Sequence, residues 1–388
     1  MGVCIVGWAH SPFGRLDGQD IEALIQGVSK GALVDADITG AEIDGVWLGN
    51  FNAGMIPDGF CSSMAFGADP ALRWKPATRL ENACASGAAA LYGACDAIEA
   101  GRAKFALVIG AEKMTGISGA EVTRALGNAS YFKEESSQGM TFPGIFGKLA
   151  GAYFERYGDH SATLAMIAAK NHANGVHNPY AQMRKDLGFE FCNTVSERNP
   201  MVAAPLRKTD CSLVSDGAAA LILADEREAK RFRRAIRLNA RVQVNDLLPM
   251  SQRDTLSFEG PRRAWQQALK TAGRKVHDLS FVEVHDCFTI AELLAYEAMG
   301  LAAPGQGASL LEQGIVMRDG ALPVNVSGGL KSKGHPVGAT GVSMHVLSAM
   351  QLAGEAGDMQ LDNPKLAGVF NMGGAAVANY VSILERVA

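Results

Sequence analysis

Cys84 lies between a short strand-like stretch, 76–83, and a helical run of small residues that continues to position 99. A thiol at such a junction faces the unpaired amide groups and the positive end of the helix dipole, which favour the thiolate over the thiol. Cys84 is therefore a candidate nucleophile. The alternative is that Cys84 is a small buried hydrophobic residue with a purely structural role.

Two further segments favour the chemical interpretation. His335 stands in a glycine-rich loop at the start of a second helical run, and His285, Asp286 and Cys287 directly follow an apolar strand-like stretch. Alone, His285 and Cys287 would be a core pair, but polar residues just beyond a strand are where α/β proteins place ligand contacts. A cysteine nucleophile, a histidine base and a second cysteine together form a constellation suited to acyl transfer.

Composition excludes several other functions. The chain has 36 Lys and Arg against 40 Asp and Glu, so nothing indicates a nucleic-acid-binding surface. The 7 cysteines are odd in number and scattered, with no pair at the spacing typical of zinc or dithiol sites. We therefore expect no metal site and a reducing compartment. Because no apolar stretch is long enough to span a membrane and no N-terminal leader pattern is present, we expect a cytoplasmic protein.

The elements that must position these residues form a weak internal repeat. Apolar strand-like runs alternate with helical patterns, which indicates an α/β fold with buried sheets. In the first half a strand leads to Cys84, a helix and the strand 104–110; in the second half, 322–327 leads to His335, a helix and the strand 365–370. The two reactive residues therefore occupy equivalent places in two similar halves.

The first half also contains a long insertion. The second half passes through a turn at 371–374 directly into its last strand, 376–384, whereas the matching strand of the first half, 216–223, comes much later than expected. The insertion contains helix-like pieces at 143–157 and 161–174. So long an excursion between strands is normally functional. We therefore predict a first half (1–118 and 207–247), an inserted loop domain that binds substrate and coenzyme (119–206), and a second half (248–388).

The glycine-rich segment 329–334 superficially resembles a phosphate-binding loop. His335 stands where that motif requires lysine, which argues against a nucleoside triphosphate site. The glycines more simply allow the backbone to approach a substrate closely and carry His335 into the site.

Taken together, these motifs resemble the thiolase superfamily over essentially the whole chain. Four segments appear in the family's order: Cys-Ala-Ser at 84–86, His-Asp-Cys-Phe at 285–288, Gly-His-Pro at 334–336, and a final Gly-Gly turn at 373–374. Most thiolases carry Asn-Glu-Ala-Phe and Cys-x-Gly where this chain has His-Asp-Cys-Phe and Asn371-Met-Gly. Both replacements are similar to the sterol-carrier-protein-type and archaeal-type acetoacetyl-CoA thiolases, in which the second reactive cysteine lies at the position of Cys287.

The resemblance implies a five-layered α/β/α/β/α core built from two βαβαβαββ halves, with a loop domain inserted in the first. It also implies a homodimer or homotetramer, with coenzyme A as a co-substrate and no tightly bound cofactor. Ser212 matches a family position that contacts the pantetheine arm of coenzyme A.

The resemblance further implies a role for each reactive residue. Cys84 would attack the keto carbon of a 3-ketoacyl-CoA after His335 accepts its proton, and Cys287 would protonate the released enolate. The backbone amides of Cys84 and Gly373 would hold the thioester oxygen, and His335 with His285 would hold the enolate oxygen. Free coenzyme A would then take the acyl group.

Other readings remain open. The same fold supports decarboxylating condensing enzymes, 3-hydroxy-3-methylglutaryl-CoA synthases and retro-aldolases that act on steroid side chains, although the combination of Cys84, His335 and Cys287 favours thiolysis or Claisen condensation. The chain could also be a weakly active scaffold that binds acyl-CoA and a partner such as a small OB-fold, zinc-ribbon protein. Acyl chain length depends on loop-domain residues around 140–146.

Overall fold

The apolar runs of the first half form the strands β3-β2-β4-β7-β1, in that order, in the computed structural model, which describes residues 2–387. β2 pairs in parallel with β3 and β4, whereas β7 is antiparallel to both β4 and β1. β4 and β7 are buried along their whole length, which is typical of strands covered on both faces. The bounds are β1 Val3–His10, β2 Gly45–Gly49, β3 Ala77–Leu80, β4 Phe105–Glu112 and β7 Gly217–Asp225.

The second half repeats this order as β9-β10-β11-β8. β9 and β10 are parallel, and β11 is antiparallel to β10 and β8. The strand predicted over 322–327 is reduced to a single parallel bridge between Val324 and Val282, next to β9, where β3 would stand in the repeat. Pro323 has no amide hydrogen and Asn325 has a φ of 57°, so the ladder ends there. The bounds are β8 Ile236–Asn245, β9 Phe281–Val284, β10 Leu366–Gly373 and β11 Ala378–Arg386.

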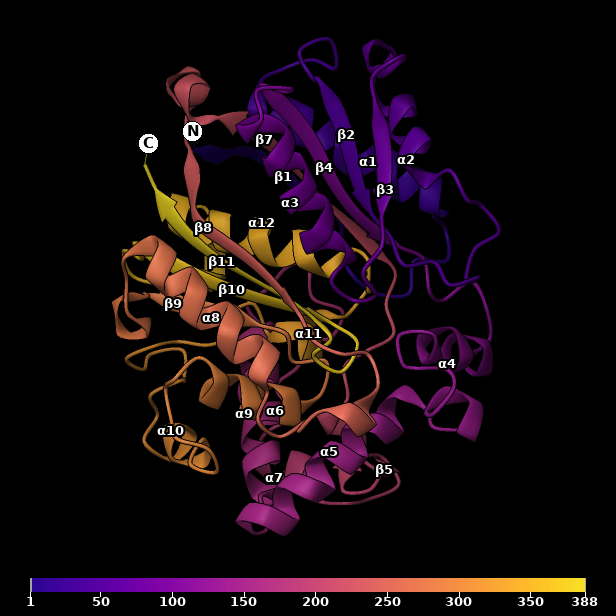
Figure 1. Cartoon of the computed structure of the whole chain (residues 1–388), viewed down its shortest axis with the longest axis vertical. Coiled ribbons are helices and arrows are strands. Elements are labelled where there is room, and N and C mark those ends of the chain that lie inside the picture. Colours follow the sequence, from indigo (N-terminus) through magenta and orange to yellow (C-terminus); the bar gives the residue numbers. More distant parts are fainter. Residues whose placement is uncertain (1, 388) are drawn as a thin grey trace.

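The two halves share one continuous sheet. β1 pairs with β8 through Cys4 with Arg237 and Ile5 with Ile236, so the described strands of both halves join in a nine-stranded sheet. Figure 1 shows the first-half strands in the upper part of the molecule and the second-half strands below them.

Alternating side chains along each strand bury two separate helical layers. In β4, Leu107 and Ile109 belong to the core beneath α1, whereas Ala106 and Val108 face α3. α12 packs on strands of both halves and against α3, and α8 covers the far face of β8 and β11. The strands of the two halves thus lie on opposite sides of a central helical layer that contains α3 and α12, with α1 and α8 outside them. The layers alternate as α/β/α/β/α, the five-layered core that the sequence predicted. The helices are α1 Ile21–Ala36, α3 Ser86–Glu99, α8 Glu259–Ala272, α9 Thr289–Ala298 and α12 Thr340–Ala353.

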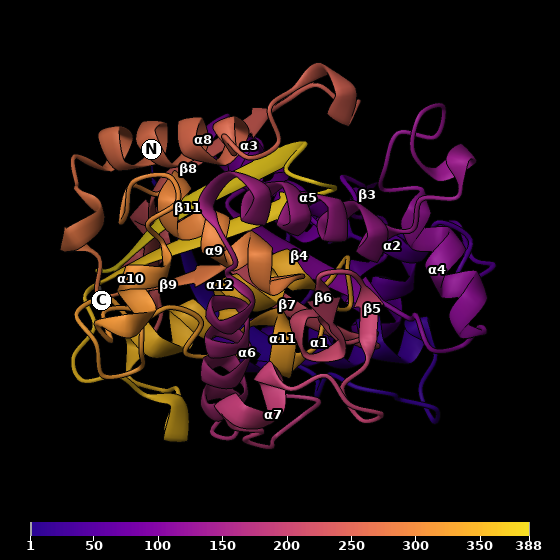
Figure 2. The same ribbon diagram turned by 90° about the horizontal axis from the view of Figure 1, so that it is seen from below.

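The predicted insertion lies between β4 and β7. The helices expected at 143–157 and 161–174 are present as α5 and α6, and both pack against α9 of the second half. Figures 1 and 2 show the insertion, in magenta, on one side of the sheet. Its elements are α4 Gly119–Gly127, α5 Phe142–Tyr157, α6 Ser161–Gly175, α7 Phe189–Asn193, β5 Met201–Ala203 and β6 Leu206–Arg207. The boundaries 119–206 and its role in substrate binding remain predictions.

Three short helices complete the assignment: α2 Cys61–Met64, α10 Ala308–Glu312 and α11 Gly329–Lys333. The glycine-rich segment thus forms α11, which leads to His335. Within the described part of the chain, no helix combines the length and apolar character needed to cross a membrane.

Candidate active site

Cys84 is held on a tight turn between β3 and α3. Ala83 adopts a φ of 50°, and the Ser86 hydroxyl accepts from the Asn82 amide at 2.9 Å and donates to the Ala83 carbonyl at 2.6 Å. These two hydrogen bonds hold Ala83 in a left-handed backbone conformation that alanine rarely adopts. It places Cys84, which is 3% exposed, immediately before the first turn of α3.

β10 runs directly against this turn. A Cβ atom at Gly373 would lie 2.2 Å from the Asn82 carbonyl oxygen, so glycine is required there by the protein's own backbone. The backbone amides that act on the Cys84 sulfur are those of Gly374 and of Cys84 itself. Gly374 is therefore a donor that the sequence did not single out, and the oxyanion role of Gly373 remains a prediction.

The tautomer of His335 follows from its neighbour Thr340. The Thr340 hydroxyl donates to the Pro336 carbonyl at 3.1 Å, so its oxygen accepts from His335 Nδ1 at 2.7 Å. His335 Nε2 is then an unprotonated acceptor. It is buried and has no hydrogen-bond partner among residues 2–387. The ring therefore presents a free lone pair, as a general base requires.

His285 has the opposite tautomer because of Asn371. The Asn371 amide nitrogen donates to the Cys84 carbonyl at 3.1 Å and to His285 Nδ1 at 2.9 Å. Since Nδ1 accepts, the proton of the neutral ring is on Nε2. His285 therefore offers a hydrogen-bond donor where His335 offers an acceptor.

The three predicted reactive groups meet in space. Cys84 Sγ and one ring nitrogen from each of His285 and His335 all lie within 4.8 Å of one another, and the two imidazole rings are 5.0 Å apart in an edge-to-face arrangement. Residues about 250 positions apart are thus brought together by the segments that follow β3, β9 and α11.

A cavity of about 140 Å³ opens onto Cys84 and His335 and also reaches two other predicted site residues, whereas His285 is not part of its lining. Cys287 and Ser212 both line it, and the Ser212 amide donates to the Cys287 carbonyl at 2.9 Å. The remaining walls come largely from the insertion and are apolar: Val122, Leu126, Phe142 and Pro143. Phe142 and Pro143 belong to the stretch predicted to affect acyl chain length.

The protonation state of Cys84 corrects one expectation. The end of α3 was expected to favour the thiolate, but burial raises the pKa of the Cys84 thiol to about 12, and the nearby Glu112 carboxyl adds to the rise. The amides of Gly374 and of Cys84 itself act in the expected direction without compensating. Burial also raises the pKa of Cys287 well above its usual value. Desolvation of the sulfur therefore outweighs the helix dipole.

Both histidines are neutral in the same surroundings. Burial lowers the pKa of His335 to about 3, with a further contribution from the Lys333 ammonium. Burial, the neighbouring His335 and Lys333 lower the pKa of His285 well below its usual value. The resting site is therefore a thiol beside neutral imidazoles, not a thiolate–imidazolium pair.

This electrostatic balance predicts a steep pH dependence of Cys84 alkylation. Because the pKa of the thiol is raised, the thiolate fraction should grow about tenfold per pH unit from pH 7 to 9.5, without a plateau. The rate can be measured with iodoacetamide and peptide mass spectrometry. A rate that stays constant down to pH 6 would instead indicate a preformed ion pair.

Two buried carboxyl groups that the sequence analysis left without a role connect the loops of the site. Glu112, at the end of β4, accepts from Asn50 Nδ2 and from the amides of Phe51, Asn52 and Gly338 at 2.9–3.0 Å. It thereby joins the loop after β2 to the loop after His335. Polar residues that end an apolar strand were the signal that identified His285, and the same signal applies to Glu112.

Asp286 performs a similar task in the His-Asp-Cys-Phe motif. Its carboxylate accepts from the amides of Leu330 at 2.6 Å and Lys331 at 3.2 Å and from Asn171 Nδ2 at 2.8 Å. A Cβ atom at Gly329 would lie 2.2 Å from this carboxylate, so the glycine permits the contact. Asp286 therefore holds α11 in place, and α11 leads directly to His335.

Replacing Asn371 with alanine should disturb His285 selectively. Without the Asn371 donor, the Nε2–H tautomer of His285 loses its support, and we expect turnover to fall about 10- to 100-fold, less than the loss of a complete oxyanion donor. Steady-state kinetics with thermal unfolding as a control would measure this. If Asn371→Ala kept full activity, the tautomer of His285 would not matter.

Comparison with known proteins agrees with this geometry. The model of the thiolase N-terminal domain matches residues 3–227, and that of the thiolase C-terminal domain-like family matches residues 243–386. The chain belongs to the thiolase family. It is 36% identical to an acetyl-CoA acetyltransferase of Methanothermobacter thermautotrophicus over 99% of both chains, and 32% identical to human sterol carrier protein 2 over 97% of this chain and 70% of that protein.

These relatives identify the thiolase as an acyltransferase. They also confirm the resemblance to the archaeal-type and sterol-carrier-protein-type branches. The solved structure of the Ltp2-ChsH2(DUF35) aldolase superposes with a TM-score of 0.85 at 18% identity, over 99% of this chain and 97% of that one. At that identity the superposition establishes a shared fold only.

Proposed function

We propose that this thiolase cleaves 3-ketoacyl-CoA with coenzyme A, or condenses acyl-CoAs in reverse, through an acyl group carried on Cys84. One observation carries the proposal. Cys84 Sγ and the free lone pair of His335 lie in the same small cluster, and Cys287 lines the same cavity. A nucleophile, its base and a second proton carrier are the groups that this reaction needs.

The first half of the reaction requires two proton transfers. The Cys84 proton passes to His335 Nε2, and the sulfur attacks the keto carbon of the substrate. The tetrahedral oxyanion then collapses, the bond between the α carbon and the former keto carbon breaks, and its electron pair leaves as the enolate of the shorter acyl-CoA. Cys287 gives its thiol proton to the enolate carbon and becomes the thiolate.

The second half returns the protons. Free coenzyme A gives its thiol proton to the Cys287 thiolate and attacks the acyl-Cys84 thioester. The Cys84 sulfur leaves and takes back the proton from His335. Each residue therefore ends in its starting state.

The tautomers explain how the enolate oxygen is held. His285 already offers Nε2–H, whereas His335 becomes a donor only after it has accepted the Cys84 proton. The second donor thus appears when the nucleophile has been activated, before the enolate forms. Oriented donors of this kind contribute several kcal/mol of transition-state stabilisation, roughly 3–4 kcal/mol each.

Lys333 adds a fixed positive charge near both rings. It is completely buried in the fold, its Nζ donates to the Ser343 hydroxyl at 3.0 Å, and its charge acts on both His285 and His335. A buried cation at this position disfavours imidazolium at rest and favours the anionic sulfur and oxygen atoms that develop during the reaction.

The test of this function is a substrate comparison. Purified protein should convert acetoacetyl-CoA and coenzyme A into two acetyl-CoA, or act on longer 3-ketoacyl-CoA esters. Retro-aldol cleavage of a 3-hydroxyacyl-CoA steroid side chain, the alternative suggested by the aldolase of similar fold, should be absent. Aldol cleavage without any thiolysis would replace the proposal.

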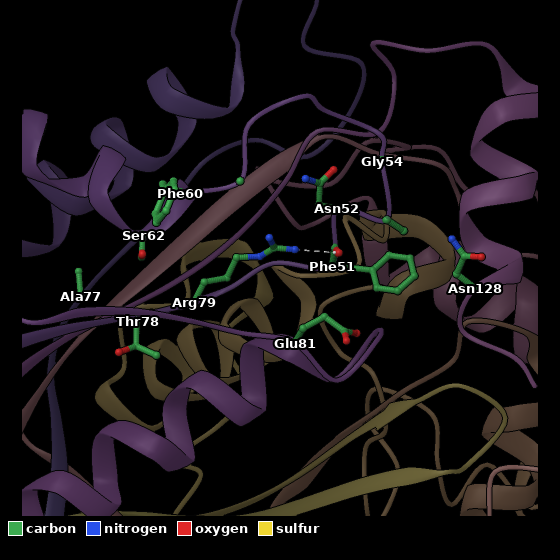
Figure 3. Close-up of a pocket in the computed structure, with 12 residues that line it drawn as sticks. Phe51, Asn52, Gly54, Phe60, Ser62, Ala77, Thr78, Arg79, Glu81 and Asn128 are labelled. Atoms are coloured by element: carbon green, nitrogen blue, oxygen red, sulfur yellow. Dashed lines mark hydrogen bonds between the residues drawn. The ribbon is translucent and has the colours of Figure 1, made fainter.

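We also propose that two copies pair through the edge strand β3. β3 ends the described sheet, and exposed edges of this kind are usually covered. An open hollow of about 870 Å³ beside it is lined by Phe51, Asn52, Phe60, Thr78, Arg79 and Asn128, and Phe60 is 85% exposed (Figure 3).

A proline in β3 tests this pairing. The backbone amide of Val46 donates to the Pro76 carbonyl and that of Asn50 to the Leu80 carbonyl, so the backbone amide and carbonyl of Ala77, which lies between them, face away from β2. Ala77→Pro should therefore yield monomers in light scattering, whereas Ala77→Val should not.

The partner protein and the compartment remain predictions. Co-purification of the tagged chain from its native host would test for an OB-fold, zinc-ribbon partner, and fluorescence microscopy would test the cytoplasmic location.

A further inference from the structure

The Cys84, His285 and His335 cluster has a property that its proposed acyl chemistry does not use. A thiol and two imidazoles with ligand atoms within 4.8 Å of one another are a soft, nitrogen- and sulfur-rich donor set. Cysteine and histidine in this combination are typical zinc ligands. The sequence showed no metal-ligand spacing because the three residues come from separate segments.

We propose that this trio binds one Zn²⁺ ion and that the bound ion blocks the nucleophile. Zinc would be held by Cys84 Sγ and by one nitrogen from each imidazole, and the cavity in front of Cys84 would leave the fourth position for water. The site is therefore a candidate for inhibition by free zinc in the thiolase.

Two buried atoms without partners support this assignment. His335 Nε2 is buried, has no partner among residues 2–387, and already presents its lone pair. The Asn371 Oδ1 atom is likewise buried without a described partner. If the Asn371 amide turns over, it gives up its hydrogen bond to the Cys84 carbonyl, and the His285 proton moves through solvent from Nε2 to Nδ1. Oδ1 then accepts a hydrogen bond from Nδ1–H, and the Nε2 lone pair of His285 is free for the metal. An oxygen acceptor behind a metal-bound histidine is the usual arrangement.

The distances require a modest contraction. Zinc bonds of about 2.3 Å to sulfur and 2.0–2.1 Å to nitrogen place tetrahedral ligands roughly 3.3–3.8 Å apart. Small side-chain rotations of the trio would achieve this. Neither the two rings nor the sulfur atom needs to leave the cluster.

The binding step releases one proton. The Cys84 S–H bond breaks, the proton passes to solvent, and the S–Zn bond forms. Because zinc replaces that proton, it overcomes the raised pKa of the thiol. Metal and acyl group then compete for the same sulfur atom, so an acylated protein cannot bind zinc in this way.

The experiment titrates the full-length protein anaerobically with Co²⁺ as a spectroscopic substitute for Zn²⁺. We expect one equivalent to give a sulfur-to-cobalt charge-transfer band and the visible bands of a tetrahedral site, both displaced by Zn²⁺ and removed by EDTA. Incubation with acetoacetyl-CoA should prevent the bands. Activity should fall at least tenfold with one equivalent of Zn²⁺ and return with EDTA.

Variants assign the ligands. Cys84→Ser should abolish the charge-transfer band, and His335→Ala and His285→Ala should each weaken Co²⁺ binding at least tenfold. Cys211→Ser is the matched control, since Cys211 lines the same cavity but does not belong to the trio. Circular dichroism would confirm that each variant is folded.

Two results would overturn the inference. One is the absence of any sulfur-to-cobalt band in the folded wild-type protein; the other is a band that survives Cys84→Ser and disappears in Cys211→Ser. Neither depends on thiolase activity, so the metal site and the proposed reaction can fail separately.

Discussion

Cys287→Ala should slow thiolysis of acetoacetyl-CoA about 10³-fold while leaving acetyl exchange between acetyl-CoA and free coenzyme A within about threefold of wild type. The reason is that Cys287 supplies the proton to the enolate carbon when the carbon–carbon bond breaks, and a positioned proton donor typically contributes 10²- to 10⁴-fold. No enolate forms in acetyl exchange, so Cys287 remains a thiol and His335 alone can carry the single proton between Cys84 and the coenzyme A sulfur. Steady-state thiolysis and isotope exchange would be measured side by side.

The matched control is Cys192→Ala. Cys192 is also a buried cysteine, but it packs in a separate small cluster within the insertion. This variant should retain both activities. Full thiolysis by Cys287→Ala would show that another group transfers the proton, and equal loss of exchange would show that Cys287 acts on acyl transfer itself.

His335→Ala should lower both thiolysis and acetyl exchange, each by about 10²- to 10⁴-fold. His335 holds the only free ring lone pair described beside Cys84, and the pKa of that thiol is raised to about 12, so without the base little thiolate forms at pH 7. Thiolysis and acetyl exchange both begin with this proton transfer. The contrast with Cys287→Ala therefore separates the two roles within one pocket.

Alkylation gives a second readout for His335. In His335→Ala the iodoacetamide rate of Cys84 should still rise with pH, because raising the pH ionises the thiol without help from the ring. Thr340→Val, which removes the partner of His335 Nδ1, should give an intermediate loss of exchange. An unchanged exchange rate in His335→Ala would assign the base elsewhere.

The architecture could be predicted because its main helices and strands each have a clear hydrophobic pattern in the sequence. The helix after Cys84, the buried strands β4 and β7, and the helices α5 and α6 all appear where apolar periodicity predicted them. The strand expected at 322–327 was wrong in extent, since Pro323 and the left-handed Asn325 limit it to one bridge. A hydrophobic pattern does not reveal where the backbone conformation prevents further strand pairing.

The positions of the candidate residues could be predicted better than their electrostatics. Cys84, His285, Cys287 and His335 were each identified by their positions beyond strand ends. The structure brings Cys84, His285 and His335 together and places Cys287 in the cavity beside Cys84 and His335, while the roles of these residues remain predictions. The protonation of Cys84 was wrong because a helix end is visible in sequence, whereas the depth of burial that outweighs it is not.

The hydrogen-bond partners of the site residues also could not be predicted from the sequence. The roles of Asn371 and Glu112 depend on contacts between segments far apart in the chain, which no local pattern encodes. Asn371 was recognised only as the place of a missing cysteine; its contact with His285 emerges from the pairing of β10 beside β9.

The most direct test of the central claim is the intact mass of the protein after brief mixing with acetoacetyl-CoA, or with longer 3-ketoacyl-CoA esters, beside Cys84→Ser. We predict an added acyl mass that maps to Cys84, is absent from the variant, and disappears when free coenzyme A is added. A folded wild-type protein that turns over or binds these substrates without acylating Cys84, or that carries the adduct on another residue, would contradict the account.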